Sequence, residues 1–285
     1  MAIFRQSNDP SGGQRMPWGG SSPRRRNVGG GIIIALLLAG FALCKYYSQS
    51  QYNEVTGANQ HISITADQEI QLGLESMPTM VQEFGGLHPD EDAQRMVKQV
   101  GQRIVQTSAA QKTPYQYDFH LLADPNVVNA FALPGGQVFI TAALFSKLET
   151  EDQLAGVFGH EIGHVVARHG AERIAKEELT QGLTGAAVVA SGDYNTAQAA
   201  QMIANLVNMS YGRDQELQSD DLGVRFMTEA GYNPEALIGV MQILESAGGG
   251  QKQPEFLSTH PSPANRVEKI KEAIAKYKDL APKPQ

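Results

Sequence analysis

The sequence contains a single cysteine, Cys44, so the chain cannot form an internal disulfide bond. It has no G-x-S-x-G motif, no P-loop and no glycine-rich dinucleotide fingerprint, and a serine or cysteine hydrolase therefore has no support. Basic residues are outnumbered 23 to 30 by acidic ones, and the net charge of −7 argues against nucleic acid as a main partner. The chemistry of the chain must therefore reside in other polar motifs.

One such motif is the pentapeptide His160-Glu161-Ile162-Gly163-His164, which has the pattern H-E-x-x-H. Thr150 and Gln153 before it fit a capping box, and the apolar positions that follow predict one largely buried helix extending to Lys176. Residues i and i+4 share a helix face, so the two imidazoles can hold one metal ion and the glutamate can reach a water on that ion. The alternative is two histidines that only pack or face solvent. A buried histidine pair needs polar partners, and a shared metal ion would provide them.

A zinc site of this kind needs a third protein ligand and keeps a fourth position for water. Metzincins place a histidine six residues after the second histidine, but that position is Gly170 here, and His169 is one residue out of register. We expect His169 to be a solvated histidine at the helix end. A carboxylate from a second helix is the alternative, because Glu216 and Asp220 lie one turn apart. Glu216 can ligate zinc, while Asp220 can accept a hydrogen bond from the other nitrogen of a ligating histidine.

Four motifs in this order resemble metallopeptidase family 48, the gluzincin group that includes the CaaX prenyl endopeptidases and HtpX. They are Asn129-Ala130-Phe131-Ala132-Leu133-Pro134-Gly135-Gly136, the His160 to His164 segment, Glu216 to Asp220, and Thr259-His260-Pro261-Ser262 with Arg266 six residues after the histidine. The resemblance covers roughly residues 60 to 275. It implies a zincin-like endopeptidase that binds one zinc ion per chain through His160, His164 and Glu216.

The resemblance also implies roles for residues outside this ligand set. Glu161 would take a proton from the zinc-activated water and pass it to the leaving amine. Asn129 and Ala130 would lie on a strand that pairs with an extended substrate, the alternative being a simple tight hairpin. His260 would either steady the oxyanion or occupy the open metal position as a latch, unless it is a loop residue without function. Arg266 would orient that region or meet the substrate, unless it is only a surface charge.

The first fifty residues differ in composition from the rest. Residues 1–27 are rich in Gly, Pro, Ser and Arg and are predicted to be a disordered cytoplasmic segment. Residues 28–47 are almost entirely apolar and are long enough to cross a bilayer as a single-pass anchor. Three arginines, 24–26, precede this span, so the positive-inside rule places the rest of the chain outside the cytoplasm, on the periplasmic side in a bacterium. A cleaved signal peptide is the second interpretation, whereas Leu43 disfavours a lipoprotein signal ending at Cys44.

The remainder is expected to comprise a linker, 48–64, and one zinc metallopeptidase domain, 65–280. Its class is α+β: zincin-like, mainly helical with a small sheet. The other predicted helices cover 65–83, 90–107, 197–209, 215–230, 234–246 and 263–278, and the predicted strands cover 115–122, 129–132 and 137–141. The small, apolar segments 182–191 and 197–207 have three interpretations: a lid over the cleft, an element on the membrane surface, or a helical hairpin of the core.

These features predict a membrane-anchored zinc-dependent metalloendopeptidase that acts on protein or peptide substrates in envelope protein quality control. Its expected partners are these substrates and the lipid bilayer. Two other classes stay open. A chaperone-like binding module would use the same cleft with little turnover, although the intact Glu161 argues against it. A structural membrane tether would bind no zinc.

Overall fold

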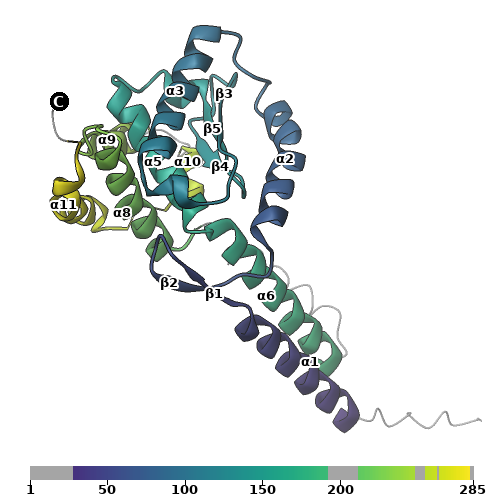
Figure 1. Ribbon diagram of the computed structural model, residues 1–285. Coiled ribbons are helices and arrows are strands. Elements are labelled where there is room, and N and C mark those ends of the chain that lie inside the picture. The colour runs from purple at the N-terminus through teal and green to yellow at the C-terminus, as the bar shows by residue number, and fades with distance from the viewer. Residues whose placement is uncertain (1–27, 192–210, 248–253, 262, 283–285) are drawn as a thin grey trace, which may run out of the picture.

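The computed structural model describes residues 28–191, 211–247, 254–261 and 263–282. Helices surround a small sheet in the main body, and two helices, α1 and α6, extend away from it side by side (Figure 1). This arrangement confirms the predicted class, which is mainly helical with little sheet. The predicted helix at 197–209 and the segment 197–207 lie outside the described residues.

The chain enters the body through α1 (Val28–Ser48) and a hairpin of β1 (Ser50–Asn53) and β2 (Ala58–His61). This hairpin occupies most of the segment expected to be a linker. It is tied to the body because Asn53 Nδ2 donates a hydrogen bond to Val166 O at 2.8 Å and Gln60 Nε2 donates one to Ala167 O. Helix α2 (Ala66–Glu83) follows, close to the predicted bounds, and its first turn carries a capping box of Thr65 and Gln68.

The three-stranded sheet has the order β3-β5-β4. Strand β3 (Asp118–Leu122) is parallel to β5 (Gln137–Thr141), while β4 (Ala130–Ala132) pairs with β5 antiparallel. The strand predicted from residue 115 begins three residues later, because the ladder of β3 with β5 starts only at the Asp118–Gln137 pair. The β4–β5 turn contains two glycines with positive φ, 83° at Gly135 and 107° at Gly136, a conformation that side chains disfavour.

The H-E-x-x-H helix, α5 (Glu151–Val166), lies at the centre of the body, and every residue from Leu154 onward is buried. Thr150 accepts the predicted cap hydrogen bond from Gln153 N, although the Gln153 side chain accepts from Glu149 N rather than completing the box. The remaining elements are α3 (Glu91–Thr107), η1 (Ala109–Lys112), α4 (Ala142–Phe145), α6 (His169–Ser191), α8 (Arg213–Glu229), α9 (Ala236–Ala247), α10 (Glu255–Thr259), α11 (Arg266–Tyr277) and η2 (Lys278–Leu280). Helix α10 was not predicted, and α11 begins three residues later than expected.

The prediction that one helix continues to Lys176 is wrong, because the chain breaks between α5 and α6. Arg168 adopts a positive φ of 55°, which ends a right-handed helix and is unusual for a residue with a side chain. Its guanidinium compensates by bonding the buried Glu69 carboxylate at 2.8 Å, Ile64 O at 3.0 Å and Gln51 Oε1 at 2.8 Å. The break redirects the chain and brings His169 back beside the end of α5.

Candidate metal centre

Glycines bring the H-E-x-x-H helix unusually close to α8. A Cβ atom added to Gly163 would lie 2.8 Å from Ser219 O, and one added to Gly159 would lie 3.1 Å from Gly223 O. Neither position could carry a larger side chain without moving a backbone. Because the two helices touch backbone to backbone, the short acidic side chains on α8 reach the histidines on α5.

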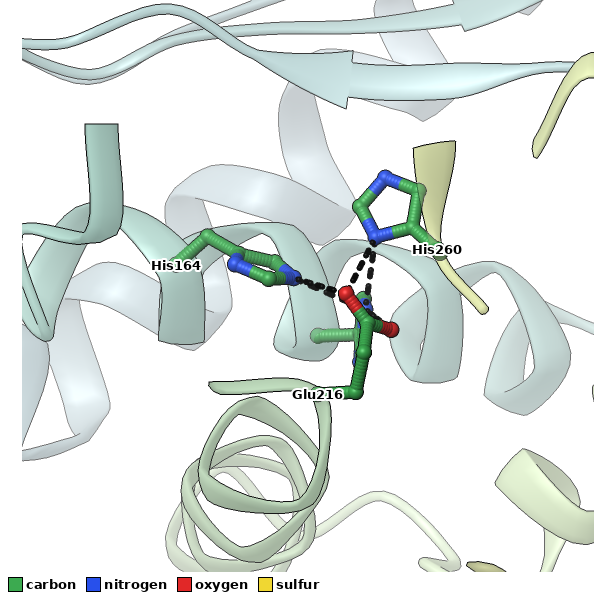
Figure 2. Close-up of side chains that lie close together, drawn as sticks. His164, Glu216 and His260 are labelled. Atoms are coloured by element: carbon green, nitrogen blue, oxygen red, sulfur yellow. Dashed lines mark hydrogen bonds and ion pairs between the residues drawn. The ribbon is translucent and has the colours of Figure 1, made fainter. Parts of the chain in front are cut away.

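Four buried side chains converge at this contact: His160, His164, Glu216 and His260. Each offers one potential ligand atom, and these atoms all lie within 4.8 Å of one another. Figure 2 shows His164 of α5, Glu216 of α8 and His260 at the end of α10 pointing toward one another. The Nε2 atoms of His160 and His164 lie 3.4 Å from Glu216 Oε2 and Oε1, respectively. The structure therefore brings together the three ligands expected from the sequence, and it adds His260 to them.

Asp220 and Arg266 hold His160 from behind. His160 Nδ1 lies 2.8 Å from Asp220 Oδ1, and the Arg266 guanidinium donates hydrogen bonds to both oxygens of this carboxylate, at 2.6 and 2.9 Å. A carboxylate accepts, so Nδ1 carries a proton and Nε2 is the nitrogen that faces the cluster. Orienting this region, the first expected role of Arg266, fits this position. A substrate contact does not fit a side chain that is only 1% exposed.

His164 is oriented by a second pair of residues, His169 and Gln218. His169 Nε2 lies 2.8 Å from Gln218 Oε1, and its Nδ1 lies 2.9 Å from His164 Nδ1. An amide oxygen only accepts, so His169 donates from Nε2 and its Nδ1 must accept from His164 Nδ1–H. The lone pair of His164 Nε2 then faces the cluster, as a metal ligand requires.

The expectation that His169 is a solvated histidine is therefore wrong, since its side chain is fully buried. The prediction assumed a continuous helix, whereas the break at Arg168 turns His169 back toward the cluster. Gln218 was not predicted, since it lies on the same helix as Glu216 but carries no motif of its own. Only the spacing of two residues from Glu216 could have drawn attention to it.

The electrostatics of the cluster suit a cation. Burial opposes ionisation of Glu216, but the adjacent His160, His164 and His260 side chains hold its pKa well below the usual range. Burial lowers the pKa of His164, which keeps its ring neutral. Burial also lowers the pKa of His160, but its contacts with Asp220 and Glu216 outweigh burial and raise the pKa to about 9, so a metal ion bound at Nε2 would displace a proton from the ring.

Two buried carboxylate oxygens support the same conclusion. Glu161 Oε1 and Glu216 Oε2 make no hydrogen bond to any residue that the structure describes. Buried oxygens without a hydrogen bond are costly, and a cation between the imidazole nitrogens and Glu216 would offset that cost at Glu216. Imidazole nitrogens and a carboxylate oxygen are ligand atoms by which zinc is bound in proteins. The residues present therefore fit a zinc ion.

Asn129 and Ala130, the two residues expected to pair with substrate, direct their backbone groups to opposite sides of β4. Asn129 O accepts from Thr141 N at 3.0 Å and Leu133 N donates to Gln137 O at 2.8 Å, so the backbone groups of Asn129 face β5. Alternate residues face the other way, which turns the N–H and C=O of Ala130 and Ala132 toward the free edge, the side of β4 on which no described strand pairs. Ala132 was not identified from the sequence. It lines a small pocket together with His164, so this edge runs beside the cluster.

Asn129 has a different role from the one expected. Its side chain is 3% exposed, and Nδ2 donates to Glu255 Oε1 of α10 at 3.3 Å. Phe256 N of the same short helix donates to Val128 O, also at 3.3 Å. The start of β4 thus anchors α10, the element that carries His260 into the cluster.

Comparison with known proteins agrees with this geometry. The sequence profile of Peptidase family M48 matches residues 91–274. The mitochondrial metalloendopeptidase OMA1 of Schizosaccharomyces pombe is 28% identical over 248 residues, covering 84% of this chain and 71% of that protein. The beta-barrel assembly-enhancing protease of Escherichia coli K12 is 28% identical over 225 residues, or 74% of this chain. The chain spans less than half of the length of this bacterial relative, since the match covers 45% of it.

Proposed function

The chain belongs to peptidase family M48, and from this premise we propose that it is a membrane-tethered endopeptidase cleaving extended segments of proteins. Members of the family are zinc metallopeptidases, and the cluster of His160, His164, Glu216 and His260 is able to bind the metal ion. The observation that carries the proposal is this convergence beside Glu161, whose buried Oε1 has no hydrogen-bond partner among the described residues.

The side chains divide the chemistry between them. A zinc ion held by His160, His164 and Glu216 would acidify a water molecule and polarise the scissile carbonyl. Glu161 Oε1 would accept the proton of the attacking water and later deliver it to the leaving amine. Burial raises the pKa of Glu161, which brings this base nearer to working pH.

Substrate binding would use the free edge of β4. An extended peptide can pair with the N–H and C=O groups of Ala130 and Ala132, which would position its backbone beside His164. Hydrogen bonds between main chains do not depend on the side chains of the substrate. This mode of binding therefore selects substrates that are unfolded or locally extended rather than substrates with one fixed sequence. Such a preference suits a protease that removes misfolded proteins.

His260 is the part of the site that opposes turnover. Its Nδ1 lies 3.1 Å from Glu216 Oε1 and 3.3 Å from His160 Nε2, so the ring occupies space among the ligands. Of the two expected roles, a latch on the fourth metal position fits this placement better than oxyanion support. Opening would require α10 to move, and α10 is anchored at Val128 and Asn129, next to the edge where substrate pairs. A peptide strand extending along β4 past Ala130 would compete with that anchor and release the latch.

Membrane tethering would come from α1. It is the one helix in the described part of the chain that is long and apolar enough to cross a membrane, and its window from Gly30 to Ser48 has a mean hydropathy of 1.8. Leu36, Leu37 and Phe41 are each about two-thirds exposed, as lipid-facing residues would be. With Arg24 to Arg26 before this helix, the peptidase domain would lie outside the cytoplasm. One relative is named for enhancing β-barrel assembly. By analogy, we propose that this protein acts in envelope protein quality control.

Casein digestion by the purified full-length chain in detergent tests the activity. We expect cleavage that a zinc chelator abolishes and that zinc restores. Glu161→Gln should still bind zinc but lose roughly 100- to 10,000-fold in rate, because proton transfer is removed. Glu177→Gln, which neutralises an exposed glutamate on α6, is the matched control and should cleave like the parent.

Two results would overturn the proposal. A parent protein that prevents casein aggregation without cleaving it would support the chaperone-like alternative. A reporter enzyme fused after Gln285 should be active only in an extracytoplasmic assay, and cytoplasmic activity would reverse the proposed topology.

A further inference from the structure

We propose that the second half of α6 enters the lipid bilayer beside α1, so that the protein inserts two helices rather than one. This inference rests on the proposed function in one respect, because it requires α1 to span the membrane. The lipid acyl chains would be the partner of this apolar part of α6, which extends away from the body of the protein beside α1 (Figure 1).

The two helices pack antiparallel along most of their length. Lys45 Nζ of α1 pairs with Glu178 Oε2 of α6 at 2.7 Å. Further along, a Cβ atom added to Gly182 would lie 2.8 Å from Ala42 Cβ, and one added to Gly31 would lie 3.4 Å from Val189 O. Contacts therefore continue to the first turns of α1. If α1 crosses the bilayer, α6 must accompany it.

The charge distribution changes at the same level on both helices. Glu178 is the last charged residue of α6, and residues 179–191 contain no Asp, Glu, Lys or Arg. On α1, Lys45 is the only charged residue. The Lys45–Glu178 ion pair thus marks a boundary beyond which both helices are uncharged. At about 1.5 Å per residue, the stretch from 178 to 189 reaches roughly 17 Å, more than half of a hydrocarbon core of about 30 Å.

The surface beyond this boundary suits lipid. Val189 is 40% exposed. A groove of about 460 Å³ between the helices includes the Lys45 and Glu178 side chains of the boundary, and its lining is otherwise mainly apolar, with Leu38, Phe41, Leu179 and Ala186. Two polar side chains just beyond the boundary bond within the helix: the Thr180 hydroxyl donates to Lys176 O at 2.8 Å, and Gln181 Nε2 donates to Glu177 Oε1 at 3.3 Å. A helix also satisfies its own backbone groups, which is the condition for entering hydrocarbon.

This placement has a consequence for substrate choice. Helix α6 begins at His169, which contacts the ligand His164, and its charged part ends at Glu178. At about 1.5 Å per residue, these nine residues put the metal centre roughly 14 Å from the membrane boundary, as measured along the helix. The substrates of the enzyme would therefore be segments of membrane proteins that lie close to the bilayer surface.

Cysteine accessibility in membranes tests the inference with the full-length chain. The starting variant is Cys44→Ser, which removes the only cysteine. Single cysteines are then introduced at three exposed positions: Leu37 on α1, Ala187 on the second half of α6, and Glu177 before the boundary. A membrane-impermeant maleimide is applied to opened vesicles. We expect Glu177→Cys to be labelled, whereas Leu37→Cys and Ala187→Cys should be labelled only after denaturation.

Labelling at the three positions distinguishes an error in the placement of α6 from an error in the proposed α1 anchor. Rapid labelling of Ala187→Cys with Leu37→Cys protected would refute the inference and leave the anchor intact. Rapid labelling of Leu37→Cys would refute the proposed anchor itself. Protection by lipid is distinguished from protection by protein with a bimane probe on Ala187→Cys and lipids carrying brominated acyl chains. Quenching is the expected result, and protection without quenching would show that another protein covers this helix.

Discussion

Gly163 offers the sharpest test of how the fold builds the metal centre. It separates the two histidines of the motif and faces α8, where a Cβ atom would lie 2.8 Å from Ser219 O and 3.0 Å from Ser219 Cα. Contacts of that length are essentially never seen for real Cβ atoms, so Gly163→Ala must push α5 and α8 apart. Glu216, which lies on α8, would then move away from the histidines on α5.

The expected magnitudes follow from two opposing effects. Overpacking a tight helix contact costs about 1–3 kcal/mol, whereas alanine gains about 1 kcal/mol over glycine in helix propensity. The variant should thus lose only about 0–2 kcal/mol of its free energy of unfolding. Zinc affinity should suffer more, because the separation of Glu216 from both histidine nitrogens is set by this contact. We expect zinc binding about tenfold weaker or worse, the size seen when ligand positioning is disturbed.

Competition with a chromophoric chelator measures the zinc affinity, and denaturant unfolding in excess chelator measures the stability of the metal-free protein. Gly156→Ala is the matched control, because it lies on the same helix but faces α9, where its Cβ would lie 3.3 Å from Leu237 Cα. It should gain the same propensity and leave zinc affinity unchanged. Parental zinc affinity in Gly163→Ala would refute the idea that close backbone contact positions Glu216.

Three further predictions concern the surrounding residues. His260→Ala should raise the rate of peptide hydrolysis with zinc still bound, because the ring no longer occupies space among the ligands. His169→Phe should weaken zinc binding roughly 10- to 100-fold, since His164 loses the acceptor that orients it; Gln218→Leu should act in the same direction. The pH–rate profile should show an acid limb above the ordinary carboxylate range, because Glu161 acts only when ionised and burial raises its pKa. Activity is therefore lost as the pH falls through that raised pKa.

Each of these predictions has a result that contradicts it. Unchanged activity in His260→Ala would remove the ring from any role at the centre. For His169→Phe the matched control is His120→Phe, which replaces another buried histidine, one that bonds Gln137 rather than a metal ligand. Equal zinc affinity in both variants would show that His169 does not orient His164. An acid limb at the pKa of a free glutamate would show that Glu161 is not the base.

Much of this protein could be predicted from the sequence because the signals are local. The cap residues Thr65, Asp90 and Thr150 begin helices where expected, and each side chain accepts the backbone hydrogen bonds of its own first turn. The short strands on either side of the Gly135-Gly136 turn were also predicted. Each of these features involves neighbours within a few residues, so the order of residue types is sufficient to specify them.

The break at Arg168 shows where local reasoning fails. The local signal against a continuous helix to Lys176 is Gly170, and the prediction treated it as an interior helix residue. The positive φ of Arg168 is stabilised instead by Glu69, Gln51 and Ile64, about a hundred residues earlier in the chain. His169 could not be assigned correctly without knowing this contact.

The sequence by itself determined the kinds of ligand and their spacing: two histidines on one helix face, a glutamate beside them, and a carboxylate pair one turn apart on another helix. Only the tertiary structure decided which nitrogen of each ring faces the centre, which residues of β4 present their backbone to the free edge, and that Arg266 lies behind the site. The physical reason is that helical and strand periodicity are set by neighbouring residues. The orientation of a buried side chain is set by whatever packs against it, and here those partners lie far away in the sequence.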